Sequence, residues 1–309
     1  MNALNKTISA LTFSTLAIAL VGCNASGDGK GAVTLDINST TTSLTRSGTV
    51  STLALLNPTA PVINGDSTTA GTITLSEAWI VVKEIELEHA DDYSDDIDED
   101  LDINDDSEKV EFRGPFVIDL LSGQSYPPLP QVTIDTGIYE DIEMDIEKLD
   151  VNDLVGIGDL PGDLETTLQN YSMYLSGSYT SADGFTHVDV PFELMYDQTD
   201  EFEFSGADFA SGFMVNDSGI NDIIVAFRML NWFAFNNPET NNGSIIDFNN
   251  DVTLTALGQI ILDGNTNNEL MIIIEDNIED SAEYGEDEDD DGELDEDEDD
   301  DSDNSIDAS

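Results

Sequence analysis

The feature that most constrains the fold is an alternation of apolar and acidic residues between positions 138 and 147. Ile138, Ile142, Met144 and Ile146 share one parity, and Asp141, Glu143, Asp145 and Glu147 share the other. Only Glu140 breaks the apolar side. Successive side chains of a β-strand point to opposite faces, so this period of two predicts a strand with one face buried and one in water.

Three other segments carry a similar pattern. Val188, Val190, Phe192, Leu194 and Tyr196 alternate with His187, Asp189, Glu193 and Asp197. Residues 79–88 begin with four apolar residues, Trp79 to Val82, and then alternate through Ile85 and Leu87. Phe112, Phe116, Ile118 and Leu120 form the third segment, in which Gly114–Pro115 predicts a bulge or an edge.

Turn signals separate these segments, and Asp183–Gly184 predicts a hairpin between residues 171–180 and 185–196. Short amphipathic strands without helical crossovers predict a mainly β fold, an antiparallel β-sandwich whose inner faces pack on each other. Residues 223–235 are apolar on all sides and fit either a buried strand or a buried helix. Residues 268–281 carry apolar residues at helical spacing and predict a short C-terminal helix.

The charge is strongly one-sided, with 67 Asp and Glu against 8 Lys and Arg, a formal net charge of -59 and a pI near 4.1. This balance argues against nucleic-acid binding, which needs clustered cations, and against electrostatic docking on anionic lipid. Two acidic stretches have too few apolar residues to contribute to a core. Residues 91–108 hold eleven acids and predict an acidic loop inserted in a hairpin, and residues 275–309 hold twenty-one acids with no base.

The amino terminus predicts export of the protein and attachment to a membrane. Residues 1–22 have the positive charge, apolar run and small residues of a signal peptide. Leu20-Val21-Gly22-Cys23 resembles a bacterial lipobox, which implies that Cys23 becomes the acylated first residue, carrying fatty chains such as palmitate. Asn24 follows the cysteine, which in this sorting pattern favours the outer membrane. The alternative is an ordinary signal peptide with an incidental cysteine.

The expected organisation has four parts. Residues 1–22 are the lipoprotein signal peptide, and 23–69 are a lipidated tether with a Ser/Thr-rich spacer. Residues 70–282 are the sandwich, and 283–309 are a disordered acidic tail. The alternative to the spacer is an extra strand at residues 39–52, with short neighbours at residues 33–37 and 52–56.

A resemblance adds to this interpretation. The run from Leu75 to Glu86, then Phe112 to Leu121 after the acidic loop, and Gly137-Ile138-Tyr139 resemble bacterial lipoproteins with a DUF4382-type domain, over about residues 71–150. The resemblance implies a β-sandwich on a lipid tether and brings no catalytic residues. The Thr-Asp-Ala-Pro segment associated with the first strand of that family is absent.

The clearest candidate for chemistry is a calcium-type loop from Asp287 to Glu298. Its carboxylates stand at Asp287, Asp289, Asp291, Glu293, Asp295 and Glu298, with Gly292 at position six and Leu294 at position eight. Ca²⁺ takes six to eight oxygen ligands, and the glycine allows the reversal that brings both loop ends to one ion. A solvated polyanion that binds cations without specificity is the alternative. Asp98, Asp100, Asp102 and Asn104 form a second ladder without the glycine, which favours a solvated loop.

Enzymatic signatures are weak. His89 and His187 have no nucleophile placed beside them by the pattern, and each is interpreted as a surface histidine. Trp79 and Trp232 could stack on sugars, although the run around Trp79 favours the core. We therefore expect a lipid-anchored, non-enzymatic envelope protein with a binding or structural role, Ca²⁺ as its cofactor and a glycan or an envelope protein as its partner. The alternatives are a polysaccharide hydrolase that uses paired carboxylates and a glycan-binding adhesion module.

Overall fold

The computed structural model describes residues 29–40, 58–89, 109–158, 160–204, 213–217, 220–236, 245–279 and 281–286. Strands dominate these residues, which confirms the prediction of a mainly β protein. The strands are β1 (Lys30–Thr40), β2 (Thr59–Ile63), β3 (Thr69–His89), β4 (Lys109–Asp119), β5 (Gln124–Tyr126), β6 (Val132–Asp135), β7 (Gly137–Ile146), β8 (Met173–Ser181), β9 (Val190–Tyr196), β10 (Asp200–Phe204), β11 (Phe213–Val215), β12 (Ile220–Arg228), β13 (Ile260–Leu262) and β14 (Ala282–Glu286). The helical segments are α1 (Leu154–Ile157), α2 (Leu164–Leu168), α3 (Met229–Trp232), α4 (Phe248–Asp251) and α5 (Asn268–Glu279).

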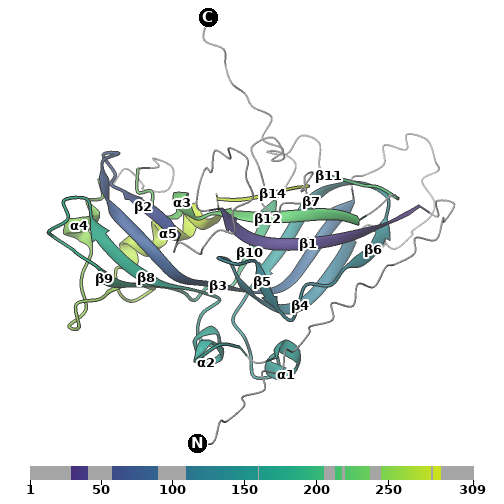
Figure 1. Cartoon of the computed structure of the whole chain (residues 1–309), viewed down its shortest axis with the longest axis horizontal. Helices are drawn as coiled ribbons and strands as arrows, with labels where there is room; N and C mark the ends of the chain where they lie inside the picture. The colour runs from purple at the N-terminus through teal and green to yellow at the C-terminus, as the bar shows by residue number, and fades with distance from the viewer. Residues whose placement is uncertain are drawn as a thin grey trace, which may run out of the picture.

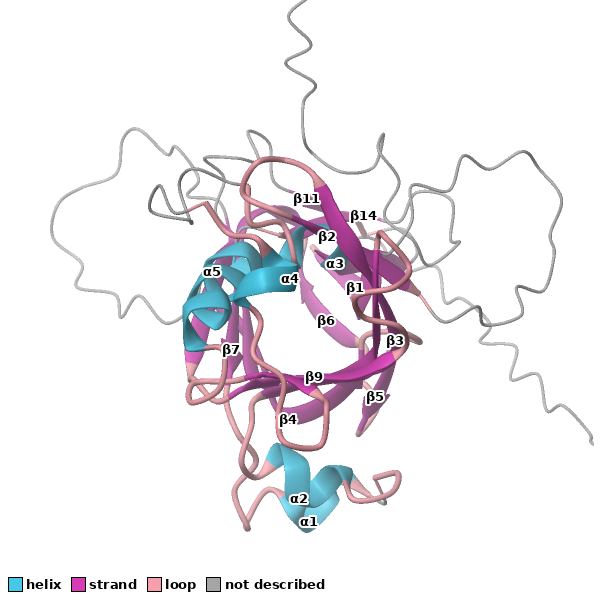
Figure 2. Ribbon diagram, turned by 90° about the vertical axis from the view of Figure 1, so that its left-hand side faces the viewer, coloured by secondary structure: helices cyan, strands magenta, loops and turns pink. Residues whose placement is uncertain are grey.

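Two sheets enclose one core (Figure 1, Figure 2). Within the described residues, sheet A has the order β14-β12-β1-β6, and the main path of sheet B is β10-β7-β3-β8-β9-β13. Strands β1 and β12 run parallel, as do β9 and β13, so the sheets are mixed and not purely antiparallel as predicted. Parallel partners need a long connection, and the two strands of each pair are far apart in the chain, so local alternation carried no information about their direction.

The core is built from the inward faces of both sheets. Sheet A contributes Val33, Leu35 and Ile37 from β1 and Ile223, Val225 and Phe227 from β12, all 2% exposed or less. Sheet B contributes Ile85 and Leu87 of β3 with Ile142, Met144 and Ile146 of β7, all fully buried. Each such side chain contributes about 1.5–3 kcal/mol when removed from water, so these faces hold the sheets together.

Strand β3 is the spine of sheet B, with β8 and β7 along one edge and β2 and β4 along the other. Its register shifts between Leu75 and Glu77 and again between Val82 and Glu84. The buried side chains change parity at each shift, from Ile73 and Leu75 to Ala78, Ile80 and Val82 and then to Ile85 and Leu87. A bulge inserts one residue and so exchanges the two faces of the strand.

Strands β4 and β7 also contain bulges. The predicted bulge at Gly114–Pro115 is confirmed, because Val82 pairs with Phe116 whereas Glu84 pairs with Arg113. A Cβ on Gly114 would lie 2.6 Å from the carbonyl oxygen of Val82, so the close approach requires glycine.

In β7 the register shifts at Glu140, since Glu88 pairs with Asp141 and His89 with Tyr139. Tyr139 is consequently buried and Ile138 is 39% exposed, so the prediction that Ile138 belongs to the buried face is wrong. Val188 is also misplaced by the sequence pattern. It is 54% exposed because β9 begins only at Val190, although the predicted hairpin itself is confirmed.

Helix α5 confirms the helix predicted for residues 268–281, and it packs with α3 beside the core. Its buried side chains are Leu270, Met271, Ile273, Ile274, Asn277 and Ile278. Residues 223–235 combine both predicted alternatives, since β12 ends at Arg228 and α3 follows at once. Helices α4 and α5 lie toward the end of the body that faces the viewer in Figure 2.

Residues 147–158 and 160–172 cover a patch on the outer surface of sheet B (Figure 1). Trp79, Val81 and Val117 point outward there and form a second apolar cluster with Leu149, Ile157, Leu164 and Leu168. An ion pair between Lys83 and Asp153, with side chains 17% and 16% exposed, fixes the same segment. This cover explains why residues 79–82 are apolar on both faces.

The boundaries of the body differ from those expected. Strands β1 and β2 lie inside the range 23–69 that was assigned to tether and spacer, and β1 pairs with both β12 and β6. Strand β14 extends the body to Glu286, beyond the expected limit at residue 282. The sandwich therefore begins at Lys30, because the short apolar run at 33–37 finds its partners far along the chain.

Candidate functional site

Acidic side chains gather on the outer surface of sheet B where β3, β4 and β7 pair. Because the inward positions of these strands are apolar, the alternate positions face water. We call this surface the acidic face and define it by Glu84, Glu86 and Glu88 of β3, Glu111 of β4, and Glu143 and Asp145 of β7.

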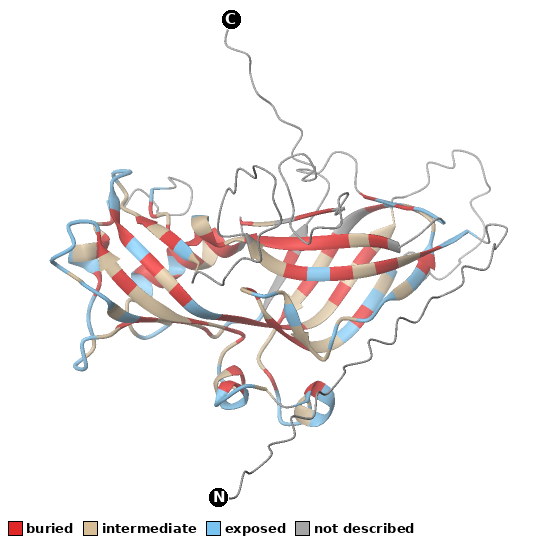
Figure 3. Cartoon of the chain, in the orientation of Figure 1, coloured by how far each residue is buried: buried red, intermediate tan, exposed pale blue. Residues whose placement is uncertain are grey.

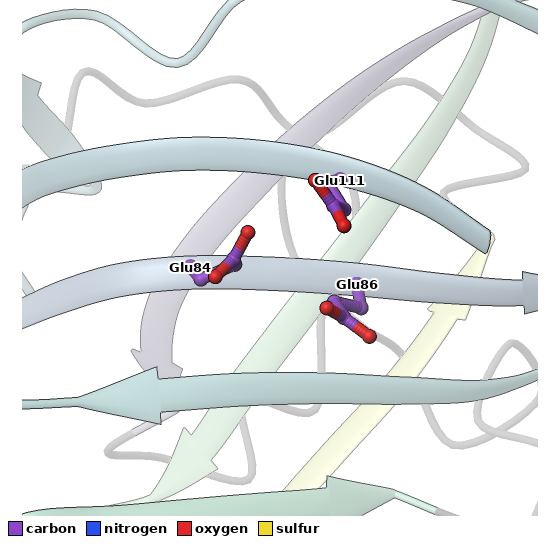
Figure 4. Close-up of side chains that lie close together, drawn as sticks. All are labelled: Glu84, Glu86 and Glu111. Atoms are coloured by element: carbon purple, nitrogen blue, oxygen red, sulfur yellow. The ribbon is translucent and has the colours of Figure 1, made fainter. Parts of the chain in front are cut away.

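Three carboxylates lie closest together on this face. Glu86 stands directly opposite Glu111 on one neighbouring strand and Glu143 on the other, and Glu84 stands opposite Arg113. One carboxylate oxygen from each of Glu84, Glu86 and Glu111 lies within 4.8 Å of the others, and Figure 4 shows the three side chains on the same side of β3 and β4. Like charges directly opposite each other destabilise a sheet, so the fold gains nothing from this arrangement.

Two cationic side chains reduce the repulsion. Lys109 Nζ lies 3.2 Å from Glu86 Oε2, 3.5 Å from Glu88 Oε2 and 3.7 Å from Glu143 Oε2. Arg113 donates from Nε to Glu111 Oε2 at 2.8 Å and lies 3.2 Å from Glu84 Oε1.

The neighbouring carboxylates raise the pKa of Lys109 and of Arg113, and the largest causes are the hydrogen bonds that Lys109 donates to Glu86 and Arg113 donates to Glu111. Six acids against two cations leave the acidic face strongly negative.

The pKa of Asp145 reflects this excess of negative charge. Burial raises its pKa above the ordinary value of 3.8, and Glu143, Glu147, Glu84 and Glu86 raise it further. Partial burial and like charges both oppose ionisation, so the charged form of Asp145 is held at a free-energy cost.

The carboxylates of Glu84, Glu86 and Glu111 could hold a divalent cation. Three carboxylates supply at most six of the six to eight oxygens that Ca²⁺ takes, and water would supply the rest. The Arg113 side chain is 74% exposed, so it can leave the oxygens of Glu84 and Glu111 without breaking the core.

The residues singled out by the sequence for lipidation and calcium lie outside the described residues. These are Cys23, the loop acids Asp287, Asp289, Asp291, Glu293, Asp295 and Glu298, and the ladder Asp98, Asp100, Asp102 and Asn104. The described chain ends at Glu286, the last residue of β14, so the calcium-type loop follows directly from an edge of sheet A.

The histidines and tryptophans are placed as follows. His89 packs edge-on against Tyr139, with ring centroids 5.0 Å apart. His187 Nε2 is buried without a hydrogen-bond partner, so the interpretation of His187 as a solvent-facing side chain is wrong for that atom. Trp79 and Trp232 are 7% and 0% exposed, which excludes both from stacking on a sugar at the surface.

The acidic face was missed by the sequence interpretation, although its signal was present. Strands β3 and β7 each showed an acidic ladder, but the two ladders and Glu111 of β4 come together only through the pairing of β3 with β4 and β7.

A scan against protein-family models found no match, and searches of curated proteins and of solved structures found none either. The resemblance to DUF4382-type lipoproteins therefore stays a prediction. Among the described helices, none is both long and apolar enough to cross a membrane.

Proposed function

We propose that this chain is a lipid-anchored protein of the bacterial cell envelope, held at the outer membrane through acylated Cys23, with a non-enzymatic binding or structural role. The observation that carries the proposal is the segment Leu20-Val21-Gly22-Cys23, which places the sole cysteine where a lipobox requires it. Several acyl chains anchor a protein firmly, because each buried methylene contributes about 0.8 kcal/mol.

The geometry of the body supports an anchor at this position. Residues 24–29 separate Cys23 from Lys30, where β1 begins, and seven extended steps reach at most about 25 Å. Lys30 pairs with Asp135 at the end of β6, two residues before β7 begins, and β7 carries Glu143 and Asp145 of the acidic face. An anchor at Cys23 would keep the acidic face close to the membrane.

We propose that divalent cations mediate between this half of the body and its surroundings. Acidic carboxylates near anionic head groups repel within a Debye length of about 8–10 Å, and a bound Ca²⁺ reduces that repulsion. Two acidic elements supply oxygen ligands: the cluster of Glu84, Glu86 and Glu111, and the loop from Asp287 to Glu298.

The anchor is tested by mass spectrometry of the native protein and by detergent phase partition. We expect a mature chain that begins at a Cys23 bearing acyl chains and partitions into the detergent phase. Cys23→Ser should move the protein to the aqueous phase, whereas Val155→Ser, an exposed substitution elsewhere, should leave partition unchanged. A native chain that retains Met1 or a free thiol at Cys23 would refute the proposal.

The cation role is tested by calorimetry on the full chain. Asp291→Ala with Glu298→Ala removes two ligands of the calcium-type loop, and Glu84→Gln with Glu111→Gln removes two carboxylate charges from the acidic face. If both elements hold Ca²⁺, each pair of substitutions should weaken Ca²⁺ binding at least tenfold at its own site and leave the other site unchanged. Equal, weak heats in all variants would mean nonspecific screening by the polyanion.

A further inference from the structure

Turns at one end of the body expose large apolar side chains. We call this region the turn end and define it by residues 64–68, 182–189, 245–251 and 254–258. The pairing of Gly71 with Ser181 places the first two turns at the same end of β3 and β8, and Gly65 N donates to Ile246 O at 2.8 Å. The turn at 254–258 leads into β13, which pairs with β9, and the left side of Figure 3 shows exposed loops in pale blue at this end.

The exposure at the turn end is unusually apolar. Phe185 is 89% exposed, Leu257 is 85% exposed and Ile245 is 81% exposed. Val188 and Leu254, in the same turns, are 54% and 38% exposed. Single exposed apolar residues need no explanation, but several large ones gathered at one end mark a surface for interaction.

The two turns that carry Phe185 and Leu257 are held by their own polar groups. Asp183 Oδ1 accepts from Phe185 N at 2.8 Å and from Thr186 N at 2.9 Å, and hydrogen bonds from Ser181 and Thr186 lower the Asp183 pKa. Thr255 N donates to Gln259 O and Gly258 N to Thr255 O, both at 2.9 Å, with Leu257 between them. The turns do not need either apolar side chain for their shape, so the fold does not account for Phe185 or Leu257.

The charges at the turn end indicate which kind of partner this surface can bind. Its four segments contain five aspartates and neither lysine nor arginine; the aspartates are Asp66, Asp183, Asp189, Asp247 and Asp251. A second copy of the chain would bring the same negative charge, and an anionic lipid surface would be repelled as well. The complement is a cationic surface that also buries Phe185 and Leu257.

The turn end points away from the start of β1. Strand β3 has 21 residues and spans about 70 Å, and its first residues lie at the turn end while His89 lies beside Tyr139 near the start of β7. A surface at this position stays open to a partner even when the other end is close to a membrane.

We propose that the turn end docks a basic, amphipathic protein segment, whose apolar side chains contact Phe185 and Leu257 and whose lysines or arginines face the surrounding aspartates. This interaction requires neither acylation of Cys23 nor Ca²⁺.

The test compares two synthetic probes on the full chain at physiological salt: an amphipathic helix of leucine and lysine, and a lysine-only peptide of equal charge. The double variant Phe185→Ser with Leu257→Ser keeps every charge and should bind the leucine–lysine helix at least tenfold more weakly, which is about 1.4 kcal/mol. Its binding to the lysine-only peptide should not change. Val155→Ser, at a side chain that is 88% exposed on α1, is the matched control and should leave both affinities unchanged.

Thermal melts check that the variants are folded, because substitutions at exposed positions should leave the melting midpoint unchanged. If the double variant melts at a lower temperature, the two single variants replace it, and each should lose part of the affinity for the leucine–lysine helix. Equal affinity of wild type and variant for the leucine–lysine helix would overturn the proposal. An equal loss in Val155→Ser would also overturn it. If the double variant loses binding to phosphatidylcholine vesicles but binds the leucine–lysine helix as tightly as wild type, the turn end is a lipid-binding surface instead.

Discussion

Replacement of Asn277 by alanine should destabilise the body by several kcal/mol. Asn277 is 4% exposed and stands in the apolar stripe of α5, between buried Ile274 and Ile278. Its Nδ2 donates to Trp232 O at 3.1 Å and to Ala234 O at 3.0 Å, so one amide joins α5 to α3 and the residues that follow it.

The magnitude follows from these two hydrogen bonds. A buried carbonyl that loses its donor, such as Trp232 O, costs about 1–3 kcal/mol, and the part-buried Ala234 O costs less, so Asn277→Ala should cost roughly 2–5 kcal/mol. Native domains are stable by only about 5–15 kcal/mol, so this loss is large. Asn277→Asp keeps the shape of the side chain but replaces the donor with a charged oxygen near pH 7, and it should cost at least as much as alanine.

Urea unfolding followed by circular dichroism measures the effect, with the slope of the transition checked for constancy. Ile272→Ala is the control, since Ile272 is 44% exposed on the other side of α5 and should change the stability by less than about 1 kcal/mol. If Asn277→Ala and Ile272→Ala unfold at the same urea concentration, the argument that Asn277 joins α5 to α3 is wrong.

Two other substitutions test the acidic face and the sheet. Burial first, and then the neighbouring acids, raise the pKa of Asp145, so its ionisation opposes folding above pH 3.8. Asp145→Asn should therefore raise the thermal midpoint at pH 7, and this gain should shrink as the pH falls and vanish below 3.8; a gain that persists at pH 3 would contradict the sign. Gly177→Ala would place a Cβ 2.1 Å from Thr74 O, so it should cost at least about 1–3 kcal/mol in urea unfolding, and unchanged stability would show that β3 and β8 can separate there.

The strand faces could be predicted because alternation is local. Ile142, Met144 and Ile146 lie on one face whatever the strand pairs with, and they are fully buried as expected. The bulge at Gly114–Pro115 was also visible, since proline lacks the N–H that a sheet ladder needs. These features depend on the backbone of a few consecutive residues.

The prediction for Ile138 failed because of a bulge, whose position the alternation of apolar and polar residues does not fix. Glu140 interrupts the apolar side of its segment, and the register shifts at that residue, so Ile138 lies on the opposite face from Ile142. The interruption was the signal of a bulge, but one polar residue on an apolar face is equally consistent with an edge or a strand end.

Pairing between distant segments was beyond the sequence. Residues 33–37 were assigned to the tether and spacer, with a short strand there only as the alternative, yet β1 pairs with β12 from Ala32↔Ile220 onward. Trp79 and Val81 face outward and are buried only because residues 147–158 and 160–172 fold back over them. The apolar run at residues 79–82 indicates burial on both faces, but it does not identify the partner, which lies far along the chain.

The repulsion on the acidic face is outweighed by burial on the opposite side of the same strands. Cross-strand contacts between Glu86, Glu111 and Glu143 each oppose the pairing of their strands by up to about 1 kcal/mol. The opposite sides of the same strands bury Ile85 and Leu87, and each of these contributes about 1.5–3 kcal/mol, so the sheet forms despite the repulsion. Lys109 and Arg113 offset part of the repulsion, and the divalent cation proposed for Glu84, Glu86 and Glu111 would offset more of it.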